Sequence, residues 1–105
     1  MKLSDALFNW LQIKVVADAR PDDRSARDTE EFFRDILTQD HQVGNVSYSK
    51  DETMYILRYE ASGVQKMQMY EIETVEQLLQ AIENEPKFNN LRQKSPSSAK
   101  QVGDE

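Results

Sequence analysis

An almost continuous apolar stretch near the start of the chain predicts a buried helix. Its hydrophobic side chains are Leu7, Phe8, Trp10, Leu11, Ile13, Val15 and Val16. A surface helix normally carries an apolar stripe only somewhat wider than about 100°. Ser4 is expected to cap the helix, with Leu3 packing back on its first turn, and Arg20-Pro21 should end it. We therefore expect this helix to lie at the centre of the core.

A second helix is predicted after the turn Pro21-Asp22-Asp23, whose acidic residues suit the positive end of a helix dipole. Apolar side chains then recur at alternating spacings of three and one, which is typical of one helical face. These inward residues are Thr29, Phe32, Phe33, Ile36 and Leu37. Charged residues fill the other side, so the helix should pack along a single stripe and end between Gln39 and His41.

Alternation of apolar and polar residues between Val43 and Ile72 predicts three antiparallel strands. Gly63 suits the left-handed last position of a three-residue loop, Ala61-Ser62-Gly63. That loop pairs Tyr59 with Gln65, Leu57 with Met67 and Tyr55 with Met69. It collects one apolar sheet face from Val46, Tyr48, Tyr55, Leu57, Tyr59, Met67 and Met69. A two-residue Ser62-Gly63 turn would mix both methionines with Arg58 and Ile56, so the longer loop is favoured.

A third helix is predicted from Thr74 to Glu85, because Thr74 and Gln77 form a capping box. Its buried stripe consists of Val75, Leu78, Leu79 and Ile82. The sequence thus predicts an α+β fold in the order ααβββα, in which a three-stranded antiparallel meander packs against helices. We expect one domain over residues 1–88 and a disordered polar tail over residues 89–105.

The charge of the chain narrows the range of partners. The 105 residues carry a formal net charge of −6, so a nucleic-acid backbone would be repelled on average. The chain has no cysteine, which is compatible with a cytoplasmic protein. The apolar residues form neither a signal-peptide core nor a membrane span. We expect a soluble cytoplasmic protein for which nucleic acid is an unlikely partner.

The second face of the predicted sheet is unusually apolar. The three-residue loop leaves Met54, Ile56, Val64, Tyr70 and Ile72 on that face, with charged residues toward the hairpin tip. Either the first or last helix of the same chain covers the apolar end, or it is a surface for self-association or a protein partner. The interaction residues predicted for the second case are Met54, Ile56, Tyr70 and Ile72, with Trp10 beside them.

Catalytic and cofactor motifs are absent from the sequence. A single histidine without a cysteine predicts no transition-metal site, and the glycines form no phosphate-binding loop. No pair of carboxylates stands out as an acid and base. The sequence therefore favours a protein-interaction or regulatory module without a cofactor, metal or catalytic residue. Self-association as a homodimer is one form of this hypothesis. The alternatives are a small-ligand binder or acid–base enzyme with a pocket between helices and sheet, and a single-strand nucleic-acid binder.

Overall fold

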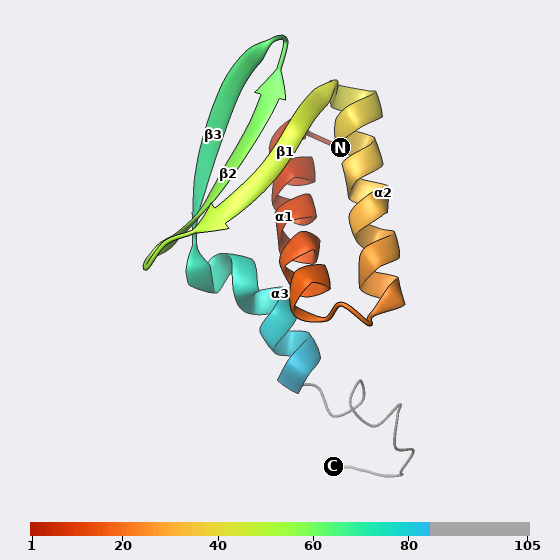
Figure 1. Ribbon diagram of the computed structural model, residues 1–105, viewed down its shortest axis with the longest axis vertical. Coiled ribbons are helices and arrows are strands. Elements are labelled where there is room, and N and C mark those ends of the chain that lie inside the picture. Colours follow the sequence, from red (N-terminus) through yellow and green to blue (C-terminus); the bar gives the residue numbers. More distant parts are fainter. Residues whose placement is uncertain (85–105) are drawn as a thin grey trace.

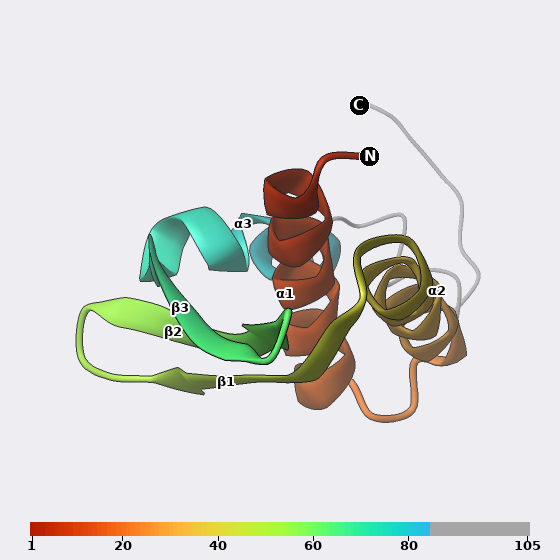
Figure 2. The ribbon, with the colours of Figure 1, turned by 90° about the horizontal axis from the view of Figure 1, so that it is seen from above.

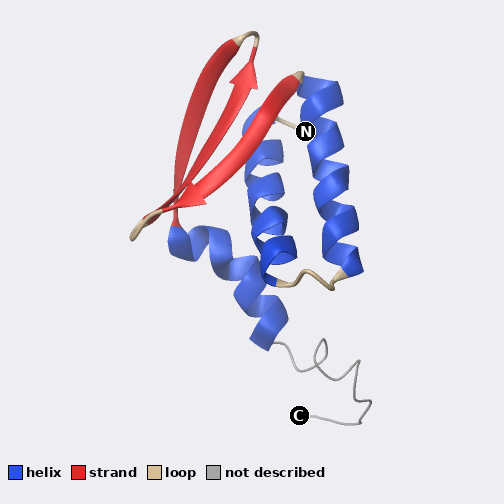
Figure 3. Ribbon diagram, in the orientation of Figure 1, coloured by secondary structure: helices blue, strands red, loops and turns tan. Residues whose placement is uncertain are grey.

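The computed structural model describes residues 1–84. Its elements are α1 (Leu3–Ala19), α2 (Arg24–His41), β1 (Val43–Lys50), β2 (Met54–Ala61), β3 (Val64–Glu71) and α3 (Ile72–Asn84). The strands form one antiparallel sheet in the order β1-β2-β3 (Figures 1 and 3). This arrangement confirms the predicted α+β fold and its order ααβββα. The predicted tail and the end of the predicted domain lie outside the described residues.

Helix α1 is the centre of the molecule, as its sequence predicted. It lies between α2 on one side and the sheet with α3 on the other (Figure 2). Its buried residues therefore face several directions: Ala6, Leu7, Trp10, Leu11, Ile13, Val15, Val16 and Ala17. The prediction that Ser4 caps this helix is wrong, because the helix already begins at Leu3. Lys2 takes the capping position without a side-chain hydrogen bond, and Leu3 packs against the core.

Helix α2 starts at a side-chain cap and packs on α1 along a narrower stripe than predicted. The Asp23 carboxylate accepts a hydrogen bond from the Ala26 backbone N–H at 3.0 Å. Leu37 is completely buried, and Phe33 packs against the core. Phe32, however, was predicted to face inward and is 59% exposed. A single helix neighbour, α1, leaves this edge of the stripe in solvent.

The hairpin between β2 and β3 corrects the predicted register. Ala61 pairs with Val64 across Ser62 and Gly63, and Tyr55 pairs with Tyr70. Ser62 and Gly63 have φ angles of 55° and 74°, as a two-residue type I′ turn requires, and the twist of this turn matches that of antiparallel strands. The predicted three-residue loop is therefore wrong. The shift of one residue moves every β3 side chain to the opposite face of the sheet.

Strand β1 contains a bulge, and residues on both sides of it contact the core. Its register with β2 shifts between Gly44 and Ser47, and Asn45 has a left-handed φ angle of 50°. Val43 before the bulge is buried, and Tyr48 beyond it packs against the same core. The core face of the sheet also receives Tyr55, Leu57 and Tyr59, all buried.

Helix α3 begins directly after β3, at Ile72, two residues earlier than predicted. Thr74 consequently lies within the first turn, so the expected capping box does not mark the start of the helix. The predicted stripe is confirmed, because Val75 is completely buried while Leu78, Leu79 and Ile82 pack against the core. The helix lies against α1 and below the sheet (Figure 1).

Candidate interaction surface

The outer face of the sheet carries a group of apolar side chains away from the helices. Directly paired residues of antiparallel strands project to the same face, and Ile56 pairs with Met69 while Arg58 pairs with Met67. We define the outer patch as Met54, Ile56, Met67 and Met69. The two β3 methionines are 55% and 49% exposed. The helices of the described chain lie on the other side of the sheet (Figure 2), so none of them covers this patch.

The structure divides the five residues predicted for interaction between two environments. Met54 and Ile56 lie on the outer face, as expected. Trp10 is only 2% exposed, within the core. Tyr70 pairs with Tyr55 on the core face and lies 5.5 Å from Phe8 between ring centroids. Ile72 starts α3 and packs against the same core.

Met67 and Met69 are the outer residues that sequence reasoning assigned to the core. Both change face because the hairpin turn contains two residues rather than three. The sequence did contain the relevant signal, since Ser-Gly can form a short turn with both residues at positive φ. The three-residue loop gives a more uniform apolar face, but that uniformity does not determine the turn.

Strand β3 also provides an unpaired sheet edge next to the outer patch. The sheet ends with β1 on one side and β3 on the other, and within residues 1–84 no further strand pairs with either. The bulge interrupts β1, which also contacts α2. Strand β3 pairs with β2 over its whole length without a register shift. Most of its residues are exposed, so its free edge is open to solvent.

A cluster of Lys50, Tyr55 and Glu76 joins α3 to the core face of the sheet. The Glu76 carboxylate accepts hydrogen bonds from the Tyr55 hydroxyl at 2.5 Å and from Lys50 Nζ at 2.9 Å. These hydrogen bonds lower the pKa of Glu76. Burial, together with the hydrogen bond to Glu76, raises the pKa of Tyr55 above its usual range. Near neutral pH Glu76 therefore stays ionised and Tyr55 protonated, which suits a structural link better than proton transfer.

A second tyrosine ties the sheet to α1 in a similar way. The Tyr48 hydroxyl donates to the Asp18 carboxylate at 2.6 Å. Lys14 pairs with the other oxygen of Asp18 at 3.0 Å. Burial raises the pKa of Tyr48, and the hydrogen bond to Asp18 adds to the effect. Tyr48 is thus held protonated at the junction of two elements and is unsuited to acid–base exchange near neutral pH.

Glu30 is a buried carboxylate that sequence reasoning did not single out. Its side chain accepts a hydrogen bond from Trp10 Nε1 at 2.9 Å. Arg34 donates to both carboxylate oxygens, at 3.0 and 3.1 Å. Each oxygen of Glu30 therefore has a partner, as a buried charge requires. The arrangement joins α1 to α2 and leaves no unpaired group directed at a ligand.

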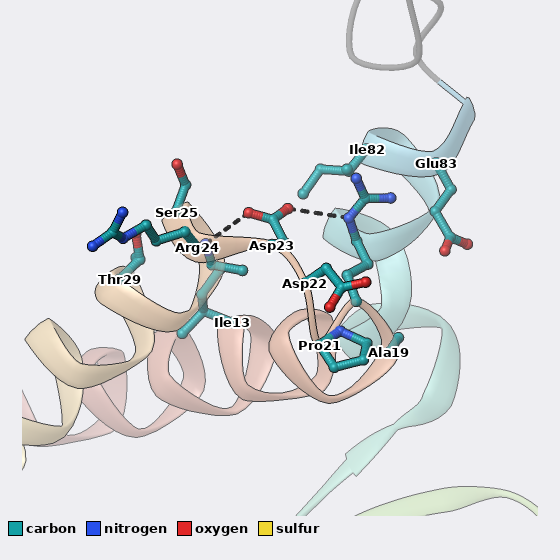
Figure 4. A pocket seen from close by; sticks show the side chains of 12 residues that line it. Ile13, Ala19, Pro21, Asp22, Asp23, Arg24, Ser25, Thr29, Ile82 and Glu83 are labelled. Carbon is teal, nitrogen blue, oxygen red and sulfur yellow. Dashed lines mark hydrogen bonds and ion pairs between the residues drawn. The ribbon is translucent and has the colours of Figure 1, made fainter. Parts of the chain in front are cut away.

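A cavity lies where the α1–α2 turn meets the end of α3 (Figure 4). Its volume of about 750 Å³ is in the range of small-molecule sites. The carboxylate of Asp23 is already engaged there, by the Ala26 N–H and by Arg20 Nε. The hydrogen bond from Ala26, followed by that from Arg20, lowers the pKa of Asp23. The predicted alternative placed a pocket between helices and sheet, whereas this cavity lies among helix ends.

Residues 1–84 contain neither a candidate metal site nor a helix that could span a membrane. No group of three histidine, cysteine, aspartate or glutamate side chains in this region could hold a metal ion. Over the same residues, none of the helices has the length and apolar character needed to cross a membrane. No family model, no curated protein and no solved structure matched the chain.

Proposed function

We propose that this protein is an interaction module without catalytic activity, and that the outer patch is its docking surface. The observation that carries the proposal is the exposure of Met67 and Met69 on a sheet face that no described helix covers. Contiguous exposed apolar side chains on a soluble protein usually mark an interaction site. Methionine is well suited to such a surface, because its flexible side chain adapts to partners of different shape.

The surroundings of the outer patch resemble the rim of a protein interface. Arg58 and Glu60 extend from β2 on the same face, and Gln65 and Glu71 extend from β3. An interface typically combines an apolar centre with a polar, solvent-accessible rim. Burial of one methionine side chain stabilises a complex by roughly 1.5 to 3 kcal/mol before the costs of association. Two methionines with Ile56 thus provide a suitable centre for a modest interface.

The proposal is tested by comparing partners recovered through chemical crosslinking in the native cell. The Met67→Gln/Met69→Gln double variant removes apolar surface without adding charge. Phe32→Gln is the matched control, because Phe32 is equally exposed but lies on α2. We expect the wild type and Phe32→Gln to recover the same crosslinked proteins, and the double variant to lose them. Recovery of the same proteins by all three would contradict the proposal.

A further inference from the structure

Within residues 1–84, the outer edge of β3 presents a regular row of backbone groups that pair with no other strand. In a two-residue turn the residues on either side, here Ala61 and Val64, share a backbone hydrogen bond. Antiparallel pairs then alternate between bonded and non-bonded positions. Gln65, Met67, Met69 and Glu71 are therefore the β3 residues whose N–H and C=O groups point away from β2. Two of these four residues also belong to the outer patch.

The β3 edge lacks most of the features that protect edge strands from pairing. Proteins commonly block such edges with a proline, a bulge, a very short strand or a charge pointing inward. The eight residues of β3 include no proline, and their register with β2 has no bulge. Lys66 is the only cation in the strand, and because it pairs with the buried Tyr59 it points to the core face, so it is the one protective feature of this kind that β3 retains. β1, by contrast, has the bulge at its start.

We infer that the β3 edge pairs with the β3 edge of a second copy of this chain, antiparallel about a two-fold axis at Gln68. The inference rests on the proposed function and names the partner of the same surface. A two-fold axis perpendicular to the sheet keeps the outer faces of both copies on one side. It therefore pairs residues that share a face, and it joins two three-stranded sheets into one of six strands.

The side chains of β3 suit this position of the axis. With the axis at Gln68, Met67 of each copy lies opposite Met69 of the other, so both outer patches merge. Gln65 then lies opposite Glu71, and Lys66 lies opposite the ring of Tyr70, which can accept a cation. An axis at Lys66 would place two lysines opposite each other, which is destabilising. An axis at Met69 would pair only the last part of the strand.

The shape of the molecule leaves room for this pairing. The tip of the β2–β3 hairpin extends past the start of α1 (Figure 1). Val64, Lys66 and Met67, near the tip, are exposed. The two-fold axis at Gln68 brings the tip of one copy beside the start of α3 of the other, with Val64 opposite Ile72. The pairing therefore covers Val64 at the end of the hairpin, and the burial of this exposed apolar side chain favours the dimer.

Single cysteines test the position of the axis, because the natural chain contains none. At the axis, two copies of Gln68→Cys face each other in a non-hydrogen-bonded pair. The Cα atoms of such a pair are about 4.5 Å apart, within the range of a disulfide. We expect diamide to convert Gln68→Cys into a covalent dimer and to leave Ser47→Cys, on β1, monomeric. Equal crosslinking of both variants, or none in either, would overturn the proposal.

A proline tests the role of the backbone in the same assembly. The N–H of Met67 points away from β2, so Met67→Pro leaves the β2–β3 ladder intact while it blocks pairing at the edge. Met67→Thr is the control, because it removes the same side chain but keeps the N–H. In sedimentation experiments we expect the wild type to dimerise as concentration rises. Met67→Pro should weaken the dimer by about tenfold or more, and Met67→Thr clearly less.

Failure of this inference differs from failure of the proposed function. A wild-type protein that stays monomeric at every concentration overturns the self-pairing. The interaction function still stands in that case if the Met67→Gln/Met69→Gln variant loses a crosslinked partner. Circular dichroism melting curves of Met67→Pro show whether the subunit itself remains folded. A dimer that forms equally well in Met67→Pro and the wild type also overturns the pairing through β3.

Discussion

At the residue scale, the contact between Trp10 and Glu30 links the two longest helices through the core. Glu30 accepts the indole N–H and binds Arg34 through both oxygens. In Glu30→Ala the buried indole N–H loses its acceptor, which costs about 1 to 3 kcal/mol. We expect urea unfolding, followed by the fluorescence of Trp10, to show a loss of about 2 kcal/mol in the free energy of unfolding. Glu31→Ala, at the exposed neighbouring position, should change it little, and equal losses would contradict this role.

Glu76 should make stability depend on pH in the acid range. Hydrogen bonds from Tyr55 and Lys50 lower its pKa in the folded protein. Its contribution is therefore complete above the ordinary pKa of the unfolded chain and is lost as pH falls through the lowered value. We expect the wild type to exceed Glu76→Gln in free energy of unfolding by about 1 kcal/mol near neutral pH. The difference should shrink below about pH 4, and a difference that is constant with pH would contradict the assignment.

At the element scale, the β2–β3 turn provides a test of local conformation. Ser62 and Gly63 both have positive φ angles, which suit asparagine at the first position and glycine at the second. We expect Ser62→Asn to raise the free energy of unfolding by about 0.5 kcal/mol, and Gly63→Ala to lower it by about 1 kcal/mol. A Cβ at residue 63 meets no neighbouring atom, so the loss reports backbone strain. Thermal melts would contradict this account if Gly63→Ala were neutral.

The β2–β3 hairpin separates what the sequence could predict, the elements themselves, from what it could not, their register. The helices and strands were predictable because their periodicities are local, as in the buried stripe around Val75 and Leu79 of α3. The register of β3 was not, because both possible turns leave apolar residues on each face. The Ser62-Gly63 pair suits a two-residue turn, and the contact of Tyr70 with Phe8 in the packed core decides between the two registers. That one error exchanged Tyr70 and Ile72 for Met67 and Met69 in the candidate site.

Long-range contacts limited prediction in the helices as well. Phe32 fits the apolar period of α2. Its burial, however, depends on how many elements pack against the helix, and the periodicity gives no information about that. Glu30 shows the opposite difference between sequence and structure. It belongs to a charged face by sequence but is buried, because Trp10, twenty residues earlier, donates to it. Both cases require the position of α1, which only the assembled fold provides.

At the scale of the whole molecule, the fold places its helices on one side of a small sheet. Among residues 1–84, helix α1 has neighbours on several sides, whereas helices cover only one face of the sheet (Figure 2). The exposed side therefore combines the outer patch with the free edge of β3. Further strands in the same plane would pair with the open edge, and they would enlarge the open face rather than cover it. The proposed six-stranded sheet follows from the open edge.

Net charge opposes that assembly and makes it sensitive to salt. Each chain carries a formal charge of −6, so two copies repel each other at low ionic strength. The pairing itself contains no like-charge contact and depends on backbone hydrogen bonds and methionine burial. Screening shortens the range of the repulsion from about 30 Å at 0.01 M salt to about 8 Å at 0.15 M. We expect sedimentation of the wild type to show dimerisation strengthening several-fold between these salt concentrations. Ionic contacts across the interface would instead weaken with salt, and dimerisation that decreased over this range would contradict an apolar strand-paired interface.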